Sequence, residues 1–422
     1  MRRFLQIMSI ALFVVSLCST LSFSQTGKWT QLFPTNSPPA RCEFGMAYLG
    51  DNKILIFSGY GYSNLSYKDT WLYDYSENEW KEVICETKPR PRSAPAMVSL
   101  SEGKVLLFGG DAYNAYGDTW VFDLSLLKWT EMHTERAPIG RWGAGCANLG
   151  NGEVLLNGGS YLNSELTYND TWIYNLTKNN WDSLTIESPK GRKLAQMCEI
   201  NDNSIMLYGG SIGDTLLNDI NIYDNDVKKW KICNPKVDNL FRDAASMVNL
   251  TKNFTYVFGG WNNETKEIND SWIFDFEDST WIELNFDLQP QVRCFHSMVK
   301  INDGLAILFG GSTNTEYFND TWLFEYDPTG VKDSTNVLLA QVKVINIANG
   351  NCEIQLSNLS AGNIDIELYN TNGDFVKKLY SNYNAQPNFN LEFNTAEFSS
   401  GAYFLEIKTK DAIYHKQIMV VR

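Results

Sequence analysis

The sequence predicts an all-β protein, a six-bladed β-propeller followed by a small β-sandwich. Three observations lead to this fold class. Landmark residues recur at intervals of 49 to 51 positions, each recurring unit contains four short strand patterns, and a tryptophan near the start of the chain supplies a strand that the last unit lacks. Repeats of this length, each forming a four-stranded antiparallel sheet, are typical of a propeller.

Each unit carries the same landmarks in the same order. Arginines begin the units at Arg41, Arg92, Arg141, Arg192, Arg242 and Arg293. A glycine-rich element follows, as in "FGG" from Phe108, and then a motif such as "NDTWIYN" from Asn169. A second tryptophan ends the units at Trp80, Trp129, Trp181, Trp230 and Trp281. Because six copies keep one register, the repeat defines the fold.

The four strands of a unit are read from two hairpin-like segments. In the second unit these are "AMVSLSEGKVLLFGG" and "DTWVFDLSLLKWTEM". Each consists of two apolar or alternating runs joined by a short polar turn. The turns between first and second strands, such as "GNGE" and "NDGL", contain the Gly, Asn and Asp that tight hairpins require.

The last unit lacks its closing tryptophan, because Val331 stands at the expected position. Trp29, in "KWTQLFP", lies 51 residues before Trp80 and therefore has the missing register. We expect the N-terminal strand to complete the sixth blade, which leaves no open sheet edge between the first and last blades.

The double glycine, the "DxWxYD"-like strand and the closing tryptophan resemble the kelch repeat over about residues 27–331. The resemblance implies a propeller for residues 25–332. Three positions depart from the pattern: Ser58 replaces a glycine, Asn157 an aromatic residue and Asn221 the fourth tryptophan. These departures are local and leave the fold class unchanged.

Residues 333–422 lie beyond the repeat and predict a separate small β-sandwich. The segments "IDIELYNTNGDFVKKLY" and "FSSGAYFLEIKTKDAIYHKQIMVVR" resemble the C-terminal sorting domain of the bacterial type IX secretion system. The resemblance implies that the propeller is cargo for this system and that the secretion machinery is one partner. A generic adhesion-type sandwich is the alternative.

The N-terminus predicts export. "MRR" precedes the apolar stretch "FLQIMSIALFVVSLC", and small residues precede Gln25, so residues 1–24 are expected to be a cleaved signal peptide. We therefore expect a secreted or outer-surface protein with no membrane span in the mature chain. The formal net charge of -14 argues against nucleic acid as a partner.

Residues suited to metal or nucleophilic chemistry are scarce. His133, His296 and His415 are the three histidines, and no cysteine-linked tyrosine context of the kind used by kelch-like copper oxidases accompanies them. The seven cysteines after the signal are expected to be free thiols, since an odd, dispersed set is no disulfide framework. We expect no cofactor, no metal site and no catalytic residue.

The repeated arginines and aspartates predict a structural ring. The aspartates are Asp69, Asp118, Asp170, Asp219, Asp270 and Asp320. Arginine begins the first strand and aspartate the third, and the glycines between them leave room for the side chains to meet across about 10 Å. One partly buried Arg–Asp pair per blade is expected, and ligand contact by these residues is the alternative.

The connections between second and third strands differ from blade to blade and are the expected ligand-binding region. They are rich in tyrosine and small polar residues, a mixture typical of binding loops. The candidate residues are Tyr60, Tyr62, Tyr113, Tyr116, Tyr161, Tyr168, Trp261 and Tyr317. The alternative is that these loops are simply solvated and that some tyrosines pack back on the ring.

The sequence thus favours an exported binding module that recognises a protein or glycan at the cell surface through one loop face. Two alternatives remain open. One is a carbohydrate-active enzyme, either a sugar epimerase or mutarotase or a hydrolase, with its site at the central pocket. The other is a purely structural surface component.

Overall fold

The computed structural model describes residues 26–327 and 341–420, except 63–65, 102, 162–165, 202, 237–239, 349–350, 358–361, 371–374, 386–388 and 409–412. The predicted signal peptide, residues 1–24, lies outside these residues. Every regular element in the described part of the chain is a β-strand, which confirms the predicted all-β class. By contacts the chain divides into two compact units, one of them Gln25–Thr329 and the other containing Gly330–Arg422.

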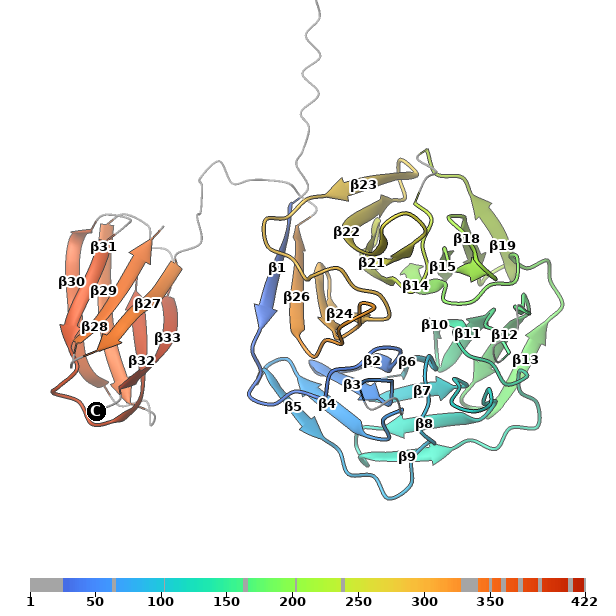
Figure 1. Cartoon of the computed structure of the whole chain (residues 1–422), viewed down its shortest axis with the longest axis horizontal. Coiled ribbons are helices and arrows are strands. Elements are labelled where there is room, and N and C mark those ends of the chain that lie inside the picture. The colour runs from blue at the N-terminus through green and yellow to red at the C-terminus, as the bar shows by residue number, and fades with distance from the viewer. Residues whose placement is uncertain are drawn as a thin grey trace, which may run out of the picture. The chain divides into compact units, whose positions relative to one another are not determined.

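The first unit contains six four-stranded antiparallel sheets, arranged around a common centre in Figure 1. The strands nearest the centre are β2 (Gly45–Gly50), β6 (Ala96–Ser101), β10 (Gly145–Gly150), β14 (Gln196–Asn201), β20 (Ser246–Thr251) and β24 (Ser297–Asn302). The second strands are β3 (Lys53–Phe57), β7 (Lys104–Phe108), β11 (Glu153–Asn157), β15 (Ser204–Tyr208), β21 (Phe254–Asn262) and β25 (Leu305–Phe309). We number the sheets 1 to 6 in this order.

The outer half of each sheet follows the same sequence order, with one exception. The third strands are β4 (Thr70–Asp74), β8 (Thr119–Asp123), β12 (Thr171–Asn175), β18 (Ile220–Asp224), β22 (Lys266–Asp275) and β26 (Thr321–Asp327). The fourth strands are β5 (Glu79–Glu82), β9 (Lys128–Glu131), β13 (Asn180–Leu184), β19 (Lys229–Cys233), β23 (Thr280–Leu284) and β1 (Thr26–Leu32). In sheet 6 the N-terminal strand β1 pairs with β26, with Trp29 opposite Phe324.

Sheets 4 and 5 carry additional hairpins between their second and third strands. In sheet 4 the short strands β16 (Ser211–Ile212) and β17 (Thr215–Leu216) form a separate two-stranded sheet. In sheet 5 the long strands β21 and β22 continue their pairing as far as Asn262 and Lys266. These loops are therefore built from paired strands.

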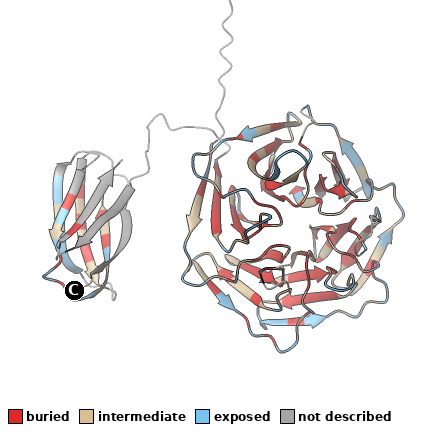
Figure 2. Ribbon diagram, in the orientation of Figure 1, coloured by how far each residue is buried: buried red, intermediate tan, exposed pale blue. Residues whose placement is uncertain are grey.

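The hydrophobic core lies between neighbouring sheets. Buried residues of sheets 1 and 2 form one cluster, and equivalent clusters join sheets 2 and 3, 3 and 4, 4 and 5, and 5 and 6. A further cluster joins sheet 6 to sheet 1 and includes Trp80 and Phe309. Figure 2 shows exposed residues concentrated on the outermost strands and loops. Burial of apolar surface on both faces of each sheet stabilises the unit.

The second unit consists of two antiparallel sheets, a three-stranded β27-β28-β31 and a four-stranded β30-β29-β32-β33. Their strands are β27 (Gln341–Ala348), β28 (Asn351–Ser357), β29 (Gly362–Asn370), β30 (Phe375–Ala385), β31 (Phe389–Asn394), β32 (Gly401–Lys408) and β33 (Ile413–Val420). A core that includes Ile366, Leu391 and Leu405 contains residues from both sheets. The described residues include no helix with the length and apolar character needed to span a membrane.

Candidate functional site

One face of the first unit contains almost every candidate residue. Successive strands of each sheet run antiparallel, so the connection from second to third strand emerges on the same side as the connection to the next sheet. We call this side the loop face. Backbone bridges tie the two sets of connections together, for example Cys42 to Tyr60 and Asp243 to Trp261.

The structure brings the repeated arginines and aspartates together beneath the loop face. Each arginine donates from both terminal nitrogens to the two carboxylate oxygens of one aspartate, at 2.5 to 2.9 Å. The pairs are Arg41–Asp69, Arg92–Asp118, Arg141–Asp170, Arg192–Asp219, Arg242–Asp270 and Arg293–Asp320. The arginine side chains are at most 3% exposed. Two parallel charge-assisted hydrogen bonds fix both partners.

The glycine-rich element contributes a third partner to each arginine. Nη1 of Arg92 donates to the Gly109 carbonyl at 2.7 Å, and Arg41 donates to the equivalent Ser58 carbonyl at 2.8 Å. Both Gly109 and Ser58 have positive φ angles, 67° and 62°. Ser58 thus keeps the glycine conformation, and its hydroxyl donates to the Tyr67 carbonyl at 2.6 Å.

The other members of the "DTW" motif are also engaged in structural contacts. The indole nitrogens of Trp71, Trp120, Trp172, Trp272 and Trp322 donate to the aspartate of their own sheet at 2.7 to 2.8 Å. In sheet 4 the amide of Asn221 donates to Asp219 at 2.8 Å. Asn221 therefore retains the hydrogen bond of the tryptophan that it replaces.

These contacts control the charge of the aspartates. Burial alone would raise the pKa of Asp69, but the hydrogen bond and charge of Arg41 outweigh it and lower the pKa. The same balance lowers the pKa of Asp118, Asp170 and Asp219. These four aspartates remain ionised partners of their arginines near neutral pH.

Two of the candidate tyrosines belong to this arginine layer. Tyr116 lies over the Arg92 guanidinium at 4.6 Å, and Tyr168 lies over Arg141 at 4.2 Å. Tyr67 and Phe318 stack on Arg41 and Arg293 in the same way. The signal was present in the sequence, because all four aromatic residues stand two positions before the paired aspartate. This repeated aromatic position is easily overlooked, because it also lies at the end of a loop whose sequence varies between blades.

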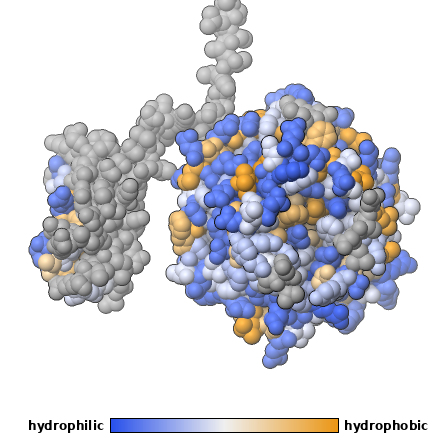
Figure 3. Space-filling view, in the orientation of Figure 1, coloured by the Kyte–Doolittle hydropathy of each residue, from blue (hydrophilic) through white to orange (hydrophobic). Residues whose placement is uncertain are grey.

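Other candidates are more open to solvent. Tyr113 is 87% exposed, Tyr62 61% and Tyr161 41%. Trp261 lies on the sheet 5 hairpin, where the Lys266 ammonium lies 4.8 Å from its ring. On the side of the unit seen in Figure 3, hydrophilic residues predominate and hydrophobic residues lie in small separate groups.

Tyr60, Tyr62 and Tyr317 form a cluster where sheets 6 and 1 meet. The Tyr317 ring lies 4.8 Å from Tyr62 and 6.0 Å from Tyr60. The Tyr317 backbone amide also donates to the Tyr62 hydroxyl at 3.1 Å. Three of the eight candidate residues thus share one place on the loop face.

A closed circuit of backbone hydrogen bonds surrounds the centre of this face. Each participating amide donates to the equivalent carbonyl of the neighbouring sheet, at 2.7 to 3.3 Å. The six residues are Glu43, Ala94, Gly143, Leu194, Ala244 and Phe295. All have φ between 44° and 62°, a left-handed conformation that is costly for residues other than glycine. A cavity of about 190 Å³ lies inside the circuit, lined by residues of all six sheets.

Two carboxyl groups, one lining the cavity and one beside it, were not among the sequence candidates. Glu43 lines the cavity, and burial, followed by the charge of Asp111, raises its pKa to about 7. Burial raises the pKa of Asp111 to about 6. Both residues stand at repeated positions, but no other sheet has a carboxyl group at the equivalent position. The two lie close together only because sheets 1 and 2 pack side by side.

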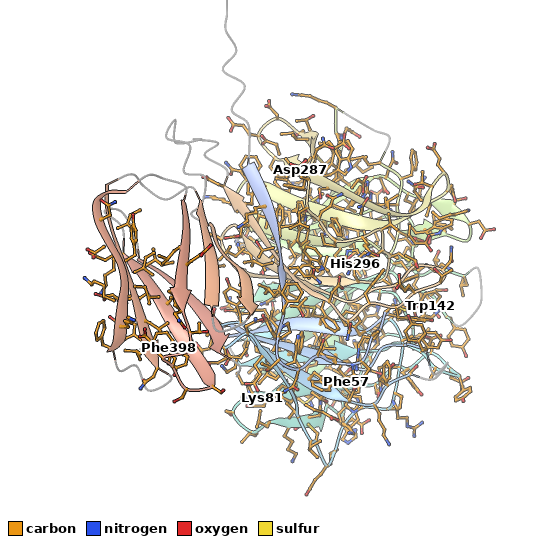
Figure 4. All side chains as sticks on the ribbon, turned by 60° about the vertical axis from the view of Figure 1, so that its left-hand side comes forward. Phe57, Lys81, Trp142, Asp287, His296 and Phe398 are labelled. Atoms are coloured by element: carbon orange, nitrogen blue, oxygen red, sulfur yellow. The ribbon has the colours of Figure 1, made fainter. Side chains whose placement is uncertain are left out.

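Metal-binding chemistry is little represented in the described part of the chain, where no group of three or more His, Cys, Asp or Glu residues could hold a metal ion. All seven cysteines of that part have free thiols. His296 lies in the interior of the first unit, as labelled in Figure 4, and lines the cavity. Burial lowers its pKa to about 3, so its imidazole is neutral.

Comparison with known proteins identifies both units. The family described as "KLHDC2/KLHL20/DRC7 Kelch-repeats domain" matches residues 14–159 and 237–333, which is more than half of the chain. The family described as "Secretion system C-terminal sorting domain" matches residues 344–421.

Several of the curated relatives are named as kelch-domain proteins. Kelch domain-containing protein 2 of Bos taurus is 24% identical over 132 residues, 31% of this chain and 32% of the relative. The Homo sapiens protein of that name is 22% identical over 294 residues, 69% of this chain and 66% of the relative. Adagio protein 3 of Arabidopsis thaliana is 29% identical over 153 residues, 35% of this chain and 25% of the relative. The chain spans about a third of the length of the bovine relative. The chain belongs to the kelch-repeat family and ends in a secretion sorting domain.

Proposed function

We propose that this chain is an exported binding protein that recognises a protein partner through the loop face of its kelch propeller. The observation that carries the proposal is the difference between the repeated and the non-repeated residues of that face. The repeated Arg, Asp, Thr and Trp residues are engaged in structural contacts, whereas Tyr62, Tyr113 and Tyr161 are exposed and not repeated. Exposed aromatic residues on a rigid scaffold are suited to binding a partner.

The proposal includes a single ring of six blades closed by the N-terminal strand. The pairing of β1 with β26 supports it. So does the hydrogen bond from the Trp80 indole in sheet 1 to the Thr321 hydroxyl in sheet 6, at 3.1 Å. The Glu43 amide also donates to the Phe295 carbonyl at 3.1 Å, which links the same two sheets at the centre. Such a ring would hold the loops in fixed relative positions.

Export is the second part of the proposal. The sorting domain matched at residues 344–421 indicates secretion through the type IX system and hence a secreted or cell-surface location. We propose residues 1–24 as the signal peptide that precedes this step, residues 25–332 as the propeller and residues 333–422 as the sorting domain that contacts the secretion machinery. The binding face would then meet partners outside the cell.

Site-specific photo-cross-linking of the full mature chain tests the binding proposal. A photoreactive phenylalanine analogue replaces Tyr62 or Tyr113 on the loop face, or Leu126 in the turn between β8 and β9 on the opposite side. Leu126 is 67% exposed and provides a matched control. We expect one cell-surface protein to be cross-linked from Tyr62 and Tyr113 and not from Leu126. Equal labelling from all three positions would contradict the proposal, and glycan-array binding without any protein cross-link would replace the protein partner with a carbohydrate.

A further inference from the structure

The circuit of backbone hydrogen bonds at the mouth has one charged member. The equivalent positions in the other sheets are occupied by Ala94, Gly143, Leu194, Ala244 and Phe295. Only Glu43 brings an ionisable side chain to this position, and it does so in a left-handed conformation with φ of 54°. A residue that is costly to the backbone and bears a charge at the centre of the binding face is a candidate for function.

Asp111 lies beside Glu43. The Ala94 amide donates to the Glu43 carbonyl at 2.7 Å, and the preceding residue, Ser93, exchanges backbone hydrogen bonds of 2.7 and 2.9 Å with Asp111. The charge of Asp111 accordingly acts on the Glu43 carboxyl, which is hydrogen-bonded to the Ser93 side chain. In the part of the chain that the structure describes, neither carboxyl makes an ion pair with lysine or arginine. Two neighbouring, partly buried carboxyls without a cation repel each other.

The tyrosine cluster borders the same place. Burial, Cys42, Tyr60, Glu43 and Tyr62 together raise the pKa of Tyr317 to about 12, which places the Glu43 charge within electrostatic range of the cluster. Tyr62 is 61% exposed and is therefore accessible to a ligand. The carboxyls thus have aromatic faces next to them.

A polar side chain in the cavity wall also has unused hydrogen-bonding capacity. His296 is 5% exposed, and neither of its ring nitrogens makes a hydrogen bond of normal geometry within the described structure. The nearby Phe258 backbone raises the pKa of the imidazole, but by less than burial lowers it. His296 follows Phe295, whose carbonyl accepts the Glu43 amide hydrogen. A neutral imidazole in this position can accept a hydrogen bond from a cationic donor.

We propose that the mouth of the cavity takes an arginine side chain of the protein partner, with its guanidinium between Glu43 and Asp111 and against the tyrosine cluster. This inference rests on the proposed function and names the chemistry of its partner. A guanidinium is planar, donates to carboxylates in pairs and stacks on aromatic rings, whereas an ammonium is a compact point charge. An acidic side chain would meet two like charges.

A peptide array tests the inference on the full mature chain. Heptapeptides with randomised sequences are screened, and the strongest binder is remade with citrulline, lysine or glutamate at its enriched position. We expect arginine to be enriched and the neutral isostere citrulline to weaken binding at least about tenfold, about 1.4 kcal/mol. Enrichment of an acidic residue, equal binding of citrulline, or no enriched peptide would overturn the inference.

Variants of the chain locate the contact. Glu43→Gln and Asp111→Asn should each weaken the arginine peptide at least about fivefold, and Glu264→Gln, at the exposed tip of the sheet 5 hairpin, should leave it unchanged. Thermal unfolding verifies that each variant is folded. If the selected peptide is acidic and is lost with Tyr62→Ala, the arginine inference fails while the loop-face function stands.

The pH dependence gives an independent readout. Binding should strengthen between about pH 5 and pH 8 as the two carboxyls ionise, and this rise should disappear in the double variant Glu43→Gln/Asp111→Asn. Three groups near Glu43 stay neutral in this range, because the pKa values of Cys42 and Tyr317 are raised to about 12 and that of Cys294 is raised by burial. A rise that persists in the double variant would contradict the assignment.

Discussion

The Trp129 indole nitrogen of sheet 2 donates a hydrogen bond of 3.1 Å to the Thr70 hydroxyl of sheet 1. Both residues are buried, and the same contact joins Trp181 to Thr119 and Trp80 to Thr321. The "DTW" motif places an acid, a hydroxyl and an indole side by side, as in a reactive site. Its hydrogen bonds instead join neighbouring sheets. Aspartate fixes the arginine, threonine accepts from the next sheet, and tryptophan donates back to the aspartate.

Thr70→Val should destabilise the propeller by about 1–2 kcal/mol, because it leaves a buried indole N–H without an acceptor. Chemical denaturation of the full chain measures the effect. Thr130→Val, on the exposed outer strand β9, is the matched control and should change stability by less than about 0.5 kcal/mol. Equal effects at the two sites would contradict a structural role for the junction.

Asp118→Asn should destabilise the fold by about 3–5 kcal/mol, since it leaves the fully buried Arg92 guanidinium without its counter-charge. The exposed pair Lys236–Asp278 provides a control, and Asp278→Asn should cost less than about 0.5 kcal/mol. The measurement is the free energy of unfolding in denaturant. A small effect of Asp118→Asn would assign these pairs to ligand contact in place of structure.

Gly143→Ala should destabilise by about 1 kcal/mol or more, because its φ is 62° and an added Cβ would lie 3.2 Å from the Leu194 side chain. Gly213→Ala separates the two causes. Gly213 has φ of 56° but no atom within 4 Å of an added Cβ, so it reports the backbone cost alone. Thermal unfolding of both variants should place Gly143→Ala as the more harmful, and the reverse order would contradict the close approach of the sheets at the circuit.

Glu43→Gln should stabilise the protein in a pH-dependent way. The pKa of Glu43 is about 7 in the folded chain against 4.5 for the unperturbed group, so the unfolded state binds fewer protons between these values. Wild-type stability therefore falls as pH rises through this window, and the variant lacks this loss. We expect the difference in unfolding free energy to be near zero at about pH 4 and on the order of 2 kcal/mol at about pH 8. A difference that does not change with pH would contradict the placement of Glu43.

Four aspartate partners of the arginines, Asp69, Asp118, Asp170 and Asp219, affect the opposite end of the pH range. Their lowered pKa values give stability that is present above the unfolded pKa and is lost as pH falls through the folded pKa. The acid limb of the stability curve should therefore lie below about pH 4, well separated from the Glu43 effect.

The repeated part of the structure could be predicted because the period places equivalent residues in equivalent strands. Arginine at the start of a first strand and aspartate at the start of a third meet across a glycine pair, as for Arg141 and Asp170. The register of Trp29 likewise anticipated the pairing of β1 with β26. Asn221 broke the pattern, yet its amide preserved the hydrogen bond to Asp219.

The mouth of the cavity could not be predicted in this way. Glu43 and Asp111 occupy repeated positions, but their carboxyl groups have no counterpart in the other sheets. They lie in different sheets, so only the packing of sheets 1 and 2 brings them together. The variable loop of Tyr116 predicts ligand binding, and the structure shows that its ring also stacks on Arg92. An aromatic residue two positions before the aspartate follows the repeat and packs on the arginine. The exposed tyrosines Tyr62, Tyr113 and Tyr161 stand at positions where the repeat has no fixed residue type.

The most direct test of the account compares the affinity of the cross-linked partner for three forms of the full chain: wild type, Tyr62→Ala/Tyr113→Ala, and Leu126→Ala. The two tyrosine substitutions remove exposed aromatic surface from the loop face, and Leu126→Ala removes exposed apolar surface from the opposite side. A loop-face site predicts at least about a tenfold loss of affinity for the tyrosine variant and none for Leu126→Ala. Unchanged affinity of the tyrosine variant, or a loss confined to Leu126→Ala, would contradict recognition through the loop face.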